Sequence, residues 1–331
     1  MILAGDIGGT KTNLALFSSQ KGVLKLEAKH QFASRDFSSL GDVIEEFLQL
    51  TSAKSIDKAC FGIAGPVIEG NCRTTNLPWE IESLALKDFL GCNDVILLND
   101  LEATAYGMLH LDEDEFVSLN PHGRKKDANR AIIAAGTGLG EAMLFYDGKN
   151  YHPSGSEGGH SDFAPTSPQQ DALLKWLRKR YRTHVSYERI LSGVGIYTLY
   201  EFLLDSDFAP QPTAMIKIQE GQDRSALISE YAIQHQDKLC METLRLFCEI
   251  YGAEAGNLAL KTLSFGGVYI GGGIAPKILP FMKKDYFMNA FLAKGRFEEM
   301  LGGMEVKISL NDETALLGAA YFVAGTSLDE S

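Results

Sequence analysis

Asn99 and Asp100 follow an apolar run, residues 95–98, and precede a helical pattern. The run predicts a buried strand, and ligands of α/β sheets usually bind where strands end. A carboxylate there can accept the proton of a hydroxyl that attacks a phosphoryl group, because a free aspartate (pKa about 3.9) is ionised at neutral pH. A structural interpretation is compatible: Asn99 caps the helix and Glu102 completes a capping box. Asp100 is therefore a candidate general base.

Glu157 and His160 stand three residues apart in the glycine-rich segment 154–165, SGSEGGHSDFAP. The spacing Glu-x-x-His holds metal ions on the helices of di-iron bundles. Two consecutive glycines disfavour a helix here, so we predict no metal site. Taken alone, the segment is typical of a polar surface loop.

A glycine-rich stretch near the N-terminus, GDIGGTKT at 5–12, nearly matches a nucleotide-binding P-loop, with Thr10 in place of the second glycine. A P-loop must lead into a helix, whereas residues 12–17 read as a strand. We predict instead a β-hairpin that turns at Gly8 and Gly9, whose backbone N–H groups can hold an anion. Asp6 is placed to meet a hydrated magnesium ion.

A second strand–glycine–strand unit begins at residue 131, with its turn at GTGLG, residues 136–140. Glycine turns are common in hairpins, so either unit alone would more often be structural. Two such units indicate duplicated lobes, and together with Asp6 they favour a clamp on a triphosphate.

The rest of the chain alternates strand and helix patterns, which predicts an α/β fold. The expected strands are residues 2–4, 60–64, 95–98, 131–134 and 268–270. The expected helices are a segment capped by Asp42, then residues 82–90, 101–111, 171–182, 238–262 and 313–325, the last with small residues for close packing.

The composition is that of a soluble globular protein: 331 residues, 45% hydrophobic and 22% charged, which is long enough for two domains. No stretch is long and apolar enough for a membrane helix, and no secretion signal is present, so we expect a cytoplasmic protein. The five cysteines form no CxxC pair and favour reduced thiols. The net charge of −12 argues against a nucleic-acid partner.

Eight segments, in order along nearly the whole chain, resemble those of the bacterial ATP-dependent glucokinases. They are GDIGGTK (5–11), TTNLPW (74–79), LND (98–100), GTGLG (136–140), SGSEGGHSDFAP (154–165), ERILSGVG (188–195), LSFGGVYIGGGIAP (263–276) and ALLGAA (315–320). The resemblance implies the ribonuclease H-like actin/hexokinase fold, with two α/β lobes that close on sugar and ATP across a cleft. The expected small lobe is 1–110 with 303–331, and the expected large lobe is 111–302.

The resemblance also implies a reaction: Mg²⁺ and ATP phosphorylate glucose at its 6-hydroxyl, and Asp100 is the base. The expected sugar-binding residues are Asn99, Asp100, Glu157, His160 and Glu188. The expected nucleotide-binding residues are Gly5, Asp6, Ile7, Gly8, Gly9, Thr10, Gly136, Thr137, Gly138, Gly272 and Gly273. On sequence alone, Glu188 would instead be a solvated acid early in a helix. Thr75 and Asn76 with Trp79 resemble a sugar-side loop, although an interior turn accounts for them nearly as well.

Two alternatives remain open at this stage. One is a kinase of the same fold that acts on another hexose or an N-acetylhexosamine, or that uses polyphosphate. The other is a non-catalytic sugar sensor or an actin-like ATPase. Related sensors carry a DNA-binding extension, and related sugar kinases carry a CxCGxxGCxE zinc motif, and neither is expected here. A homodimer is implied by the resemblance only.

Overall fold

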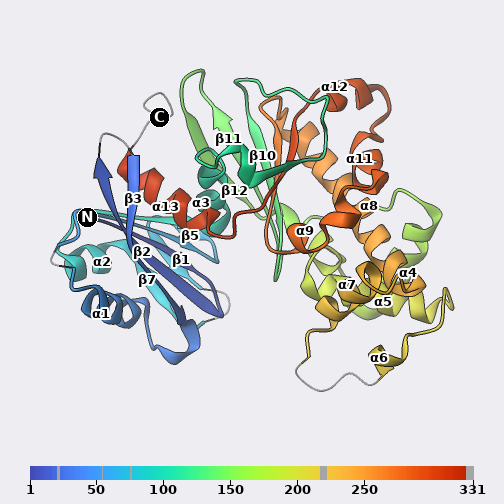
Figure 1. Ribbon diagram of the computed structural model, residues 1–331, viewed down its shortest axis with the longest axis horizontal. Coiled ribbons are helices and arrows are strands. Elements are labelled where there is room, and N and C mark those ends of the chain that lie inside the picture. The colour runs from blue at the N-terminus through green and yellow to red at the C-terminus, as the bar shows by residue number, and fades with distance from the viewer. Residues whose placement is uncertain (21–22, 54, 75–76, 217–221, 326–331) are drawn as a thin grey trace. The chain divides into compact units, whose positions relative to one another are not determined.

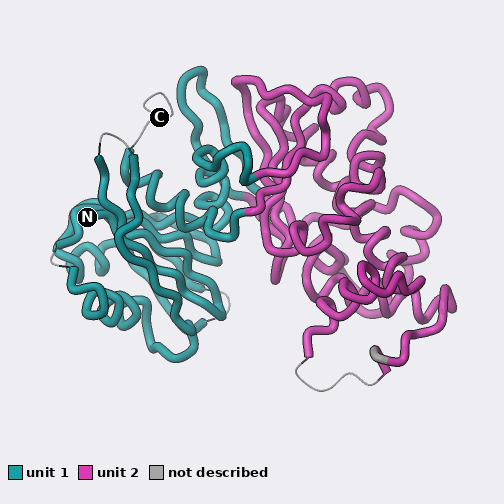
Figure 2. The backbone as a smooth tube through the Cα atoms, in the orientation of Figure 1, with its two compact units in different colours: residues 1–115, 142–155, 311–331 teal, residues 116–141, 156–310 magenta. Residues whose placement is uncertain are grey.

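The computed structural model describes residues 1–20, 23–53, 55–74, 77–216 and 222–325. The chain divides into two compact units, which Figure 2 shows in different colours. Unit 1 holds residues 1–115, 142–155 and 311–331, and unit 2 holds residues 116–141 and 156–310. Each unit is therefore assembled from segments that are distant in the sequence. The lobe boundaries expected from the sequence stay a prediction.

Unit 1 is built on a five-stranded sheet with the order β3-β2-β1-β4-β8 (Figure 1). Its strands are β1 (Ile2–Ile7), β2 (Lys11–Gln20), β3 (Val23–Ala33), β4 (Lys58–Ile63) and β8 (Asp94–Asn99). β1 and β2 form the antiparallel hairpin predicted at the N-terminus. β1, β4 and β8 run parallel, so their carboxyl ends lie at one edge of the sheet.

Helices cover both faces of this sheet, and alternate strand residues point to opposite faces. The helices of unit 1 are α1 (Leu40–Thr51), α2 (Ser83–Leu90), α3 (Asp100–Gly107) and α13 (Thr314–Ala324). Leu3 and Ile7 of β1 share a core with α1 and α2, whereas Ile2 and Ala4 share the other core with α3 and α13. Smaller elements are η1 (Ser34–Asp36), β5 (Val67–Ile68), β6 (Asn71–Arg73), β7 (Glu80–Glu82) and η2 (Glu113–Glu115).

α3 and α13 pack closely because glycines stand where they meet. A Cβ added to Gly318 would lie 1.8 Å from the carbonyl oxygen of Ala103. One added to Gly107 would lie 2.0 Å from the carbonyl oxygen of Thr314. The closing helix with small residues that the sequence predicts is thereby confirmed, and it holds the helix that begins at Asp100.

The second sheet has the order β12-β11-β10-β13-β14-β9. Its strands are β9 (Phe116–Ser118), β10 (Arg130–Ala135), β11 (Leu139–Tyr146), β12 (Tyr151–Ser156), β13 (Val268–Gly271) and β14 (Val306–Ser309). β10, β13 and β14 are parallel, and β9 is antiparallel to β14. β10 and β11 flank the second glycine turn, so the repeated strand–glycine–strand plan predicted from the sequence is present.

The main core of unit 2 surrounds the long helix α8 (Lys238–Thr262), which has the bounds expected from the sequence. α5 (Gly193–Asp205), α7 (Arg224–Ile233) and α11 (Asp285–Leu292) pack against it. The remaining elements are η3 (Gly158–His160), α4 (Pro168–Tyr181), η4 (Tyr187–Arg189), α6 (Thr213–Ile216), α9 (Ile274–Lys277), α10 (Leu279–Met282), η5 (Gly295–Phe297) and α12 (Glu298–Gly302).

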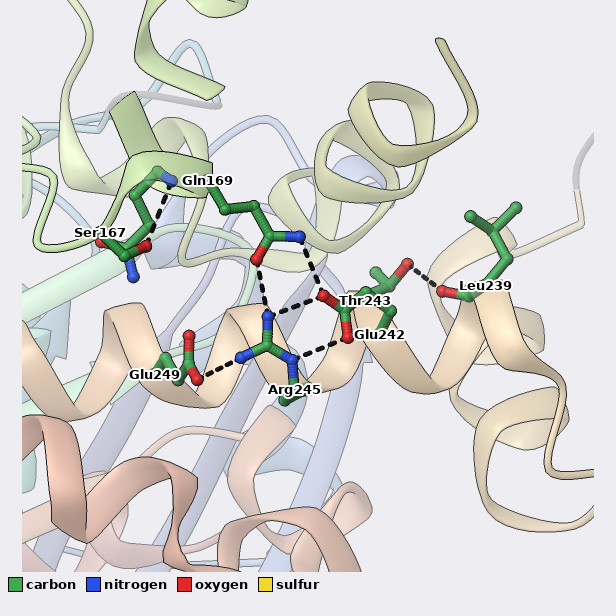
Figure 3. Close-up of polar contacts among 8 residues, drawn as sticks. Ser167, Gln169, Leu239, Glu242, Thr243, Arg245 and Glu249 are labelled. Carbon is green, nitrogen blue, oxygen red and sulfur yellow. Dashed lines mark hydrogen bonds and ion pairs between the residues drawn. The ribbon is translucent and has the colours of Figure 1, made fainter. Parts of the chain in front are cut away.

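A polar cluster ties α4 to α8, as Figure 3 shows. The Arg245 guanidinium donates to Glu242 and to Gln169 of α4, both at 2.7 Å, and also to Glu249. Gln169 in turn donates to Glu242 at 2.9 Å. The side chains of Arg245, Glu242 and Glu249 are only 25%, 14% and 26% exposed. The three charges are thus partly withdrawn from water, and the two carboxylates share one guanidinium.

Two local predictions were wrong. The N-cap of α1 is Ser39, whose hydroxyl accepts from the Asp42 N–H at 3.2 Å, so Asp42 lies inside the helix. Helix α3 ends at Gly107 and not at residue 111. Leu109 and His110 donate to carbonyls three residues back, so the chain tightens into a narrower turn there.

All five cysteines are buried free thiols, as the sequence predicts. A search of the described helices finds none with the length and hydropathy needed to cross a membrane.

Candidate active site

The residues predicted to act on ligands in unit 1 lie at or just beyond the carboxyl ends of β1 and β8, and β4 stands between these two strands. Ile7 of β1 pairs with Ile63 of β4, which pairs with Asn99 of β8. Neighbouring strands are about 4.8 Å apart, so the hairpin turn and Asn99 are on the order of 10 Å apart along this edge. The sheet therefore brings the first glycine turn and the Asn99–Asp100 pair to one edge.

The Asn99–Asp100 pair is held by the capping box that the sequence predicts. The Asn99 side chain accepts from the Leu101 N–H at 2.9 Å, and the Glu102 carboxylate accepts from the Asn99 N–H at 3.0 Å. Asn99 Nδ2 also donates to the Gly65 carbonyl at 3.0 Å. The oxygen and the nitrogen of the Asn99 side chain each make one hydrogen bond, and the start of α3 is fixed relative to the strand.

Asp100 occupies the first turn of α3 and is partly exposed. Its Oδ1 accepts from the Leu101 N–H at 2.9 Å, and the Thr104 hydroxyl donates to its carbonyl at 2.8 Å. Burial, and then the negative charge of Asp100, raise the pKa of the Cys72 thiol. Asp100 is thus an ordered carboxylate at the carboxyl edge of the sheet, and a carboxylate can accept a proton.

The first glycine turn is a true hairpin turn and not a P-loop. The Gly8 N–H donates to the Lys11 carbonyl at 2.9 Å, and a strand, not a helix, follows. The Ser34 hydroxyl donates to the Gly8 carbonyl at 2.8 Å, and the Ser34 N–H donates to the Thr10 carbonyl at 3.1 Å. Gly5 must be glycine, because an added Cβ would lie 2.5 Å from the Phe61 ring.

Asp6 stands just before this turn and is half-buried. Burial raises the pKa of Asp6, and the 3.2 Å hydrogen bond that Asn13 Nδ2 donates to it acts in the opposite direction. Within the described ranges, no cluster of three or more His, Cys, Asp or Glu side chains could hold a metal ion. A single carboxylate fits Mg²⁺ that keeps most of its water and is shared with phosphate oxygens.

The second glycine turn in unit 2 lies beside the Gly271–Gly273 segment. β10 and β13 are parallel and pair Ala134 with Gly271, so both turns leave the sheet at the same edge. Gly272 has φ +78°, and an added Cβ would lie 2.3 Å from the Ala135 carbonyl oxygen. Only glycine satisfies both the backbone angle and this close approach.

Glu188 contacts the second glycine turn. Its Oε2 accepts from the Leu139 N–H at 3.1 Å, and a Cβ added to Gly138 would lie 2.4 Å from this oxygen. The residue lies in η4, not early in a regular helix as the sequence pattern indicated. The Ile190 and Leu191 N–H groups both donate to the Tyr187 carbonyl, which closes a short turn, and the next helix starts only at Gly193.

Glu157 directly precedes the 3-10 turn η3, and His160 is its last residue; both are exposed, with 3.9 Å between Glu157 Oε2 and His160 Nε2. The turn is fastened to its surroundings through the backbone. The His160 carbonyl accepts from the His184 ring at 2.8 Å, and the Ser161 carbonyl accepts from the Tyr187 N–H at 3.1 Å. Through this link, unit 2 brings Glu157, His160 and Glu188 into one neighbourhood with the second glycine turn.

The predicted sugar-side loop receives little support from the structure. Thr75 and Asn76 lie outside the described residues. Trp79 is 2% exposed, and its indole N–H donates to the Phe37 carbonyl at 3.3 Å, which is the behaviour of a core residue. Sequence reasoning assigned Glu102 only to the cap, whereas its Oε1 also accepts from the Gly155 N–H at 3.1 Å. No sequence signal links these two residues, because the contact depends on the fold of unit 1.

The family model described as Glucokinase matches residues 3–326 of the chain. A glucokinase of Nostoc punctiforme is 40% identical over 337 residues, which cover 98% of this chain and 99% of the relative.

Solved structures agree with this result. The crystal structure of a glucokinase from an Antarctic psychrotroph is 31% identical, has a TM-score of 0.85 and covers 98% of both chains. A ROK family glucokinase from Streptomyces griseus, solved with glucose and AMPPNP, shares the fold with a TM-score of 0.68 at 18% identity, over 98% of this chain and 99% of that one. The α/β fold of the actin/hexokinase type that the sequence predicts is confirmed.

Proposed function

We propose, from the premise that this chain belongs to the glucokinase family, that it transfers the γ-phosphoryl group of ATP to the 6-hydroxyl of glucose. The products are glucose 6-phosphate and ADP. The observation that carries the proposal is the ordered Asn99–Asp100 pair at the carboxyl edge of β8, in a chain that matches the family over nearly its full length.

In the proposed reaction, Asp100 acts as the general base. The glucose 6-hydroxyl oxygen attacks the γ-phosphorus, and a new O–P bond forms while the bond to the bridging oxygen of ADP breaks. The hydroxyl proton passes to the Asp100 carboxylate. General-base assistance of this kind typically contributes 10²–10⁴-fold in rate. The capping box supports this role because it restrains the backbone at the start of α3, where Asp100 stands.

Glucose is held by Asn99, Glu157, His160 and Glu188 in this proposal. Carboxylates and an imidazole suit a neutral sugar, since each can pair with hydroxyl groups that would be costly to bury unpaired. Glu157 and His160 present their polar atoms outward from η3. Glu188 uses Oε2 on the Leu139 N–H and offers its second oxygen to a hydroxyl.

ATP is proposed to lie against the two glycine turns and the glycine loop after β13. The residues assigned to it are Gly5, Asp6, Ile7, Gly8, Gly9, Thr10, Gly136, Thr137, Gly138, Gly272 and Gly273. Asp6 would hold Mg²⁺ through water, and the bound ion would neutralise charge that develops on the transferred phosphoryl group. Lys11 is exposed, and we assign it no catalytic task.

We further propose a cytoplasmic homodimer, which rests on the resemblance and on the buried free thiols. Kinases of the same fold that act on other sugars, or that use polyphosphate, would differ from a glucokinase in a few contacts of the binding pocket. ADP release should therefore be measured with glucose, mannose, fructose and N-acetylglucosamine, and glucose phosphorylation with ATP and polyphosphate. We expect glucose with ATP and magnesium to give the highest kcat/KM. ATP hydrolysis that no sugar stimulates would contradict the proposal.

A further inference from the structure

Glu141 is a buried acid that the proposed mechanism does not use. It lies on β11, directly after the second glycine turn, and is 1% exposed. Its Oε1 is fully buried and has no hydrogen-bonding partner among the residues that the structure describes. A second acid, Glu254 in the middle of α8, is 0% exposed and lies within hydrogen-bonding reach of Glu141. Two buried carboxyl groups in contact require an explanation, because each charge alone is costly to bury.

The partners of Glu254 identify the member of the pair that keeps the negative charge. Asn257 Nδ2 donates to Glu254 Oε2 at 2.9 Å, and Lys261 Nζ lies 3.5 Å from Oε1. Such a set of donors suits a carboxylate. Burial, and then the negative charge of Glu254, raise the pKa of the Tyr187 hydroxyl. A hydrogen bond between two carboxyl groups needs one proton, and Glu141, which has no such set of donors, is the member that carries it.

The loop that holds Glu157 and His160 packs directly on this acid. A Cβ added to Gly158 would lie 2.0 Å from Glu141 Oε2, and one added to Gly159 would lie 2.0 Å from the Leu139 carbonyl oxygen. The Ser156 hydroxyl donates to the Glu141 carbonyl at 3.2 Å. No side chain fits between the loop and the strand, so the loop takes its position from β11.

We propose that Glu141 is a positioning residue for glucose binding: kept protonated by its hydrogen bond to Glu254, it forms the neutral support on which residues 156–160 rest. This inference rests on the proposed role of Glu157 and His160. Neither acid touches the reacting atoms in the proposal, and the pair acts through the shape and charge of the surface beneath the loop.

The pair makes the support sensitive to pH. Burial, and then the charge of Glu254, raise the pKa of Glu141 to about 8. The groups that face the pair are Lys261 and Tyr251 of α8, Tyr187 of η4 and Lys294 after α11. Lys294 reaches the acid pair indirectly: its Nζ donates to Asn257 Oδ1 at 2.7 Å, and Asn257 donates to Glu254. Burial lowers the pKa of Lys294. Loss of the Glu141 proton would place two negative charges side by side beneath the loop.

The test compares Glu141→Gln, Glu141→Ala and wild type in glucose binding by calorimetry and in steady-state kinetics between pH 7 and 9.5. The glutamine amide keeps the shape, can donate to Glu254 and does not titrate. We expect Glu141→Ala to raise the glucose Kd and KM about tenfold at pH 7, the usual scale for one buried hydrogen bond. Glu141→Gln should restore glucose binding to within about threefold of wild type, a margin below one such hydrogen bond.

The pH dependence separates this role from simple packing. Wild type should lose glucose affinity above pH 8, whereas Glu141→Gln should keep a constant glucose Kd there. Glu242→Gln is the matched control, because Glu242 is another poorly exposed acid of unit 2 that packs on Arg245 far from the loop in sequence. It should keep the wild-type alkaline profile. Superimposable alkaline profiles for wild type and Glu141→Gln would overturn the proposal.

Glu157→Gln distinguishes failure of this inference from failure of the site assignment. If Glu157→Gln binds glucose like wild type, the loop does not bind the sugar and the site assignment fails. If Glu157→Gln weakens glucose binding but Glu141→Ala does not, the loop role stands and the acid pair is not its support.

Discussion

In unit 1 the proposed base leaves a strand directly into a helix, whereas in unit 2 the proposed sugar-binding groups lie on two short 3-10 turns. Asn99 and Asp100 are fixed by hydrogen bonds to residues within three positions of them and to Gly65. Glu157 and His160 are fixed through backbone bonds to His184 and Tyr187 and by contact with β11. One region is positioned by local capping, and the other depends on tertiary packing.

This difference indicates which substitutions each region should tolerate. Local capping restrains Asp100 even when distant packing changes, so loss of its carboxylate should affect turnover rather than folding. The sugar loop has little regular structure of its own, so its geometry should respond to changes in the strand beneath it. The predictions below test this contrast, from the largest expected effect to the smallest.

Asp100→Asn should lower kcat by two to four orders of magnitude, the usual scale for loss of a general base. The asparagine oxygen can still accept from the Leu101 N–H, so the fold should persist. Asp94→Asn, at the opposite end of β8 and exposed, is the matched control and should keep wild-type kcat. A coupled ADP assay measures both variants. Asp100→Asn with kcat within tenfold of wild type would rule out the proposed base.

Gly318→Val should destabilise unit 1 by about 3 kcal/mol or more, because the new side chain must enter the space of the Ala103 carbonyl. Gly41→Ala in α1 is the control: its Cβ would lie 3.5 Å from the Ser39 hydroxyl, an ordinary contact. It should be neutral or stabilising by about 0.5–1 kcal/mol. Urea unfolding monitored by circular dichroism provides the comparison. Equal stabilities for the two variants would show that α3 and α13 do not meet closely.

Arg245→Met should cost about 2 kcal/mol in unit 2, between the values for exposed and fully buried ion pairs, because Glu242 and Glu249 lose their shared cation. Arg180→Met removes a 2.6 Å pair with Glu201 whose arginine side chain is 45% exposed, and should cost less than about 1 kcal/mol. Neither change should alter the glucose KM. If Arg180→Met loses more stability than Arg245→Met in denaturant unfolding, burial does not determine how much each ion pair contributes.

The two units should respond to pH in opposite directions. Burial lowers the pKa of His110 in unit 1 to about 4, and its ring stacks on Tyr321 at 3.9 Å. The unfolded chain binds this proton below about pH 6.5 and the folded chain only near pH 4, so stability falls as pH drops between these values, by up to about 1.4 kcal/mol per unit. His110→Phe, which keeps the stack, should lose less stability than wild type between pH 7 and 5.5 in urea unfolding. If His110→Phe and wild type lose the same stability between pH 7 and 5.5, His110 is not the cause of the acid-side loss.

Glu141 in unit 2 should act in the alkaline direction. Its folded pKa, about 8, lies above that of an unfolded glutamate, so its contribution to stability is full below about pH 4.5 and is lost as pH rises towards 8. Glu141→Gln should flatten this part of the stability profile, whereas Glu242→Gln should not. Parallel profiles for Glu141→Gln and wild type in urea unfolding would show that Glu141 is not buried with its proton.

Much of unit 1 could be predicted from the sequence because its signals are local. The alternation in β1 and β2, the glycine turn between them and the Asn-Asp-x-Glu cap are each contained within a few residues. The cap of α1 was assigned to Asp42 because serine and aspartate are both good N-caps, and only the backbone angles at Ser39 distinguish them.

The acid pair of unit 2 could not be predicted, because Glu141 and Glu254 are distant in sequence and meet only when α8 packs against β10, the strand next to β11 in the sheet. The sequence presents Glu254 as one acid among many on a long helix. Glu188 was expected early in a helix for a similar reason: its position depends on the contact with the Leu139 N–H, which no local pattern shows. Resemblance to a family supplied Glu188 as a candidate, and the fold shows what it touches.

The order in which the chain is made has a consequence for unit 1. α13 belongs to that unit but is translated after all of unit 2. While the ribosome is still synthesising unit 2, Ile2, Ala4 and Phe17 lack the helix that later covers them. The nascent N-terminal sheet therefore exposes an apolar face until α13 has been synthesised, and such a face is prone to aggregation.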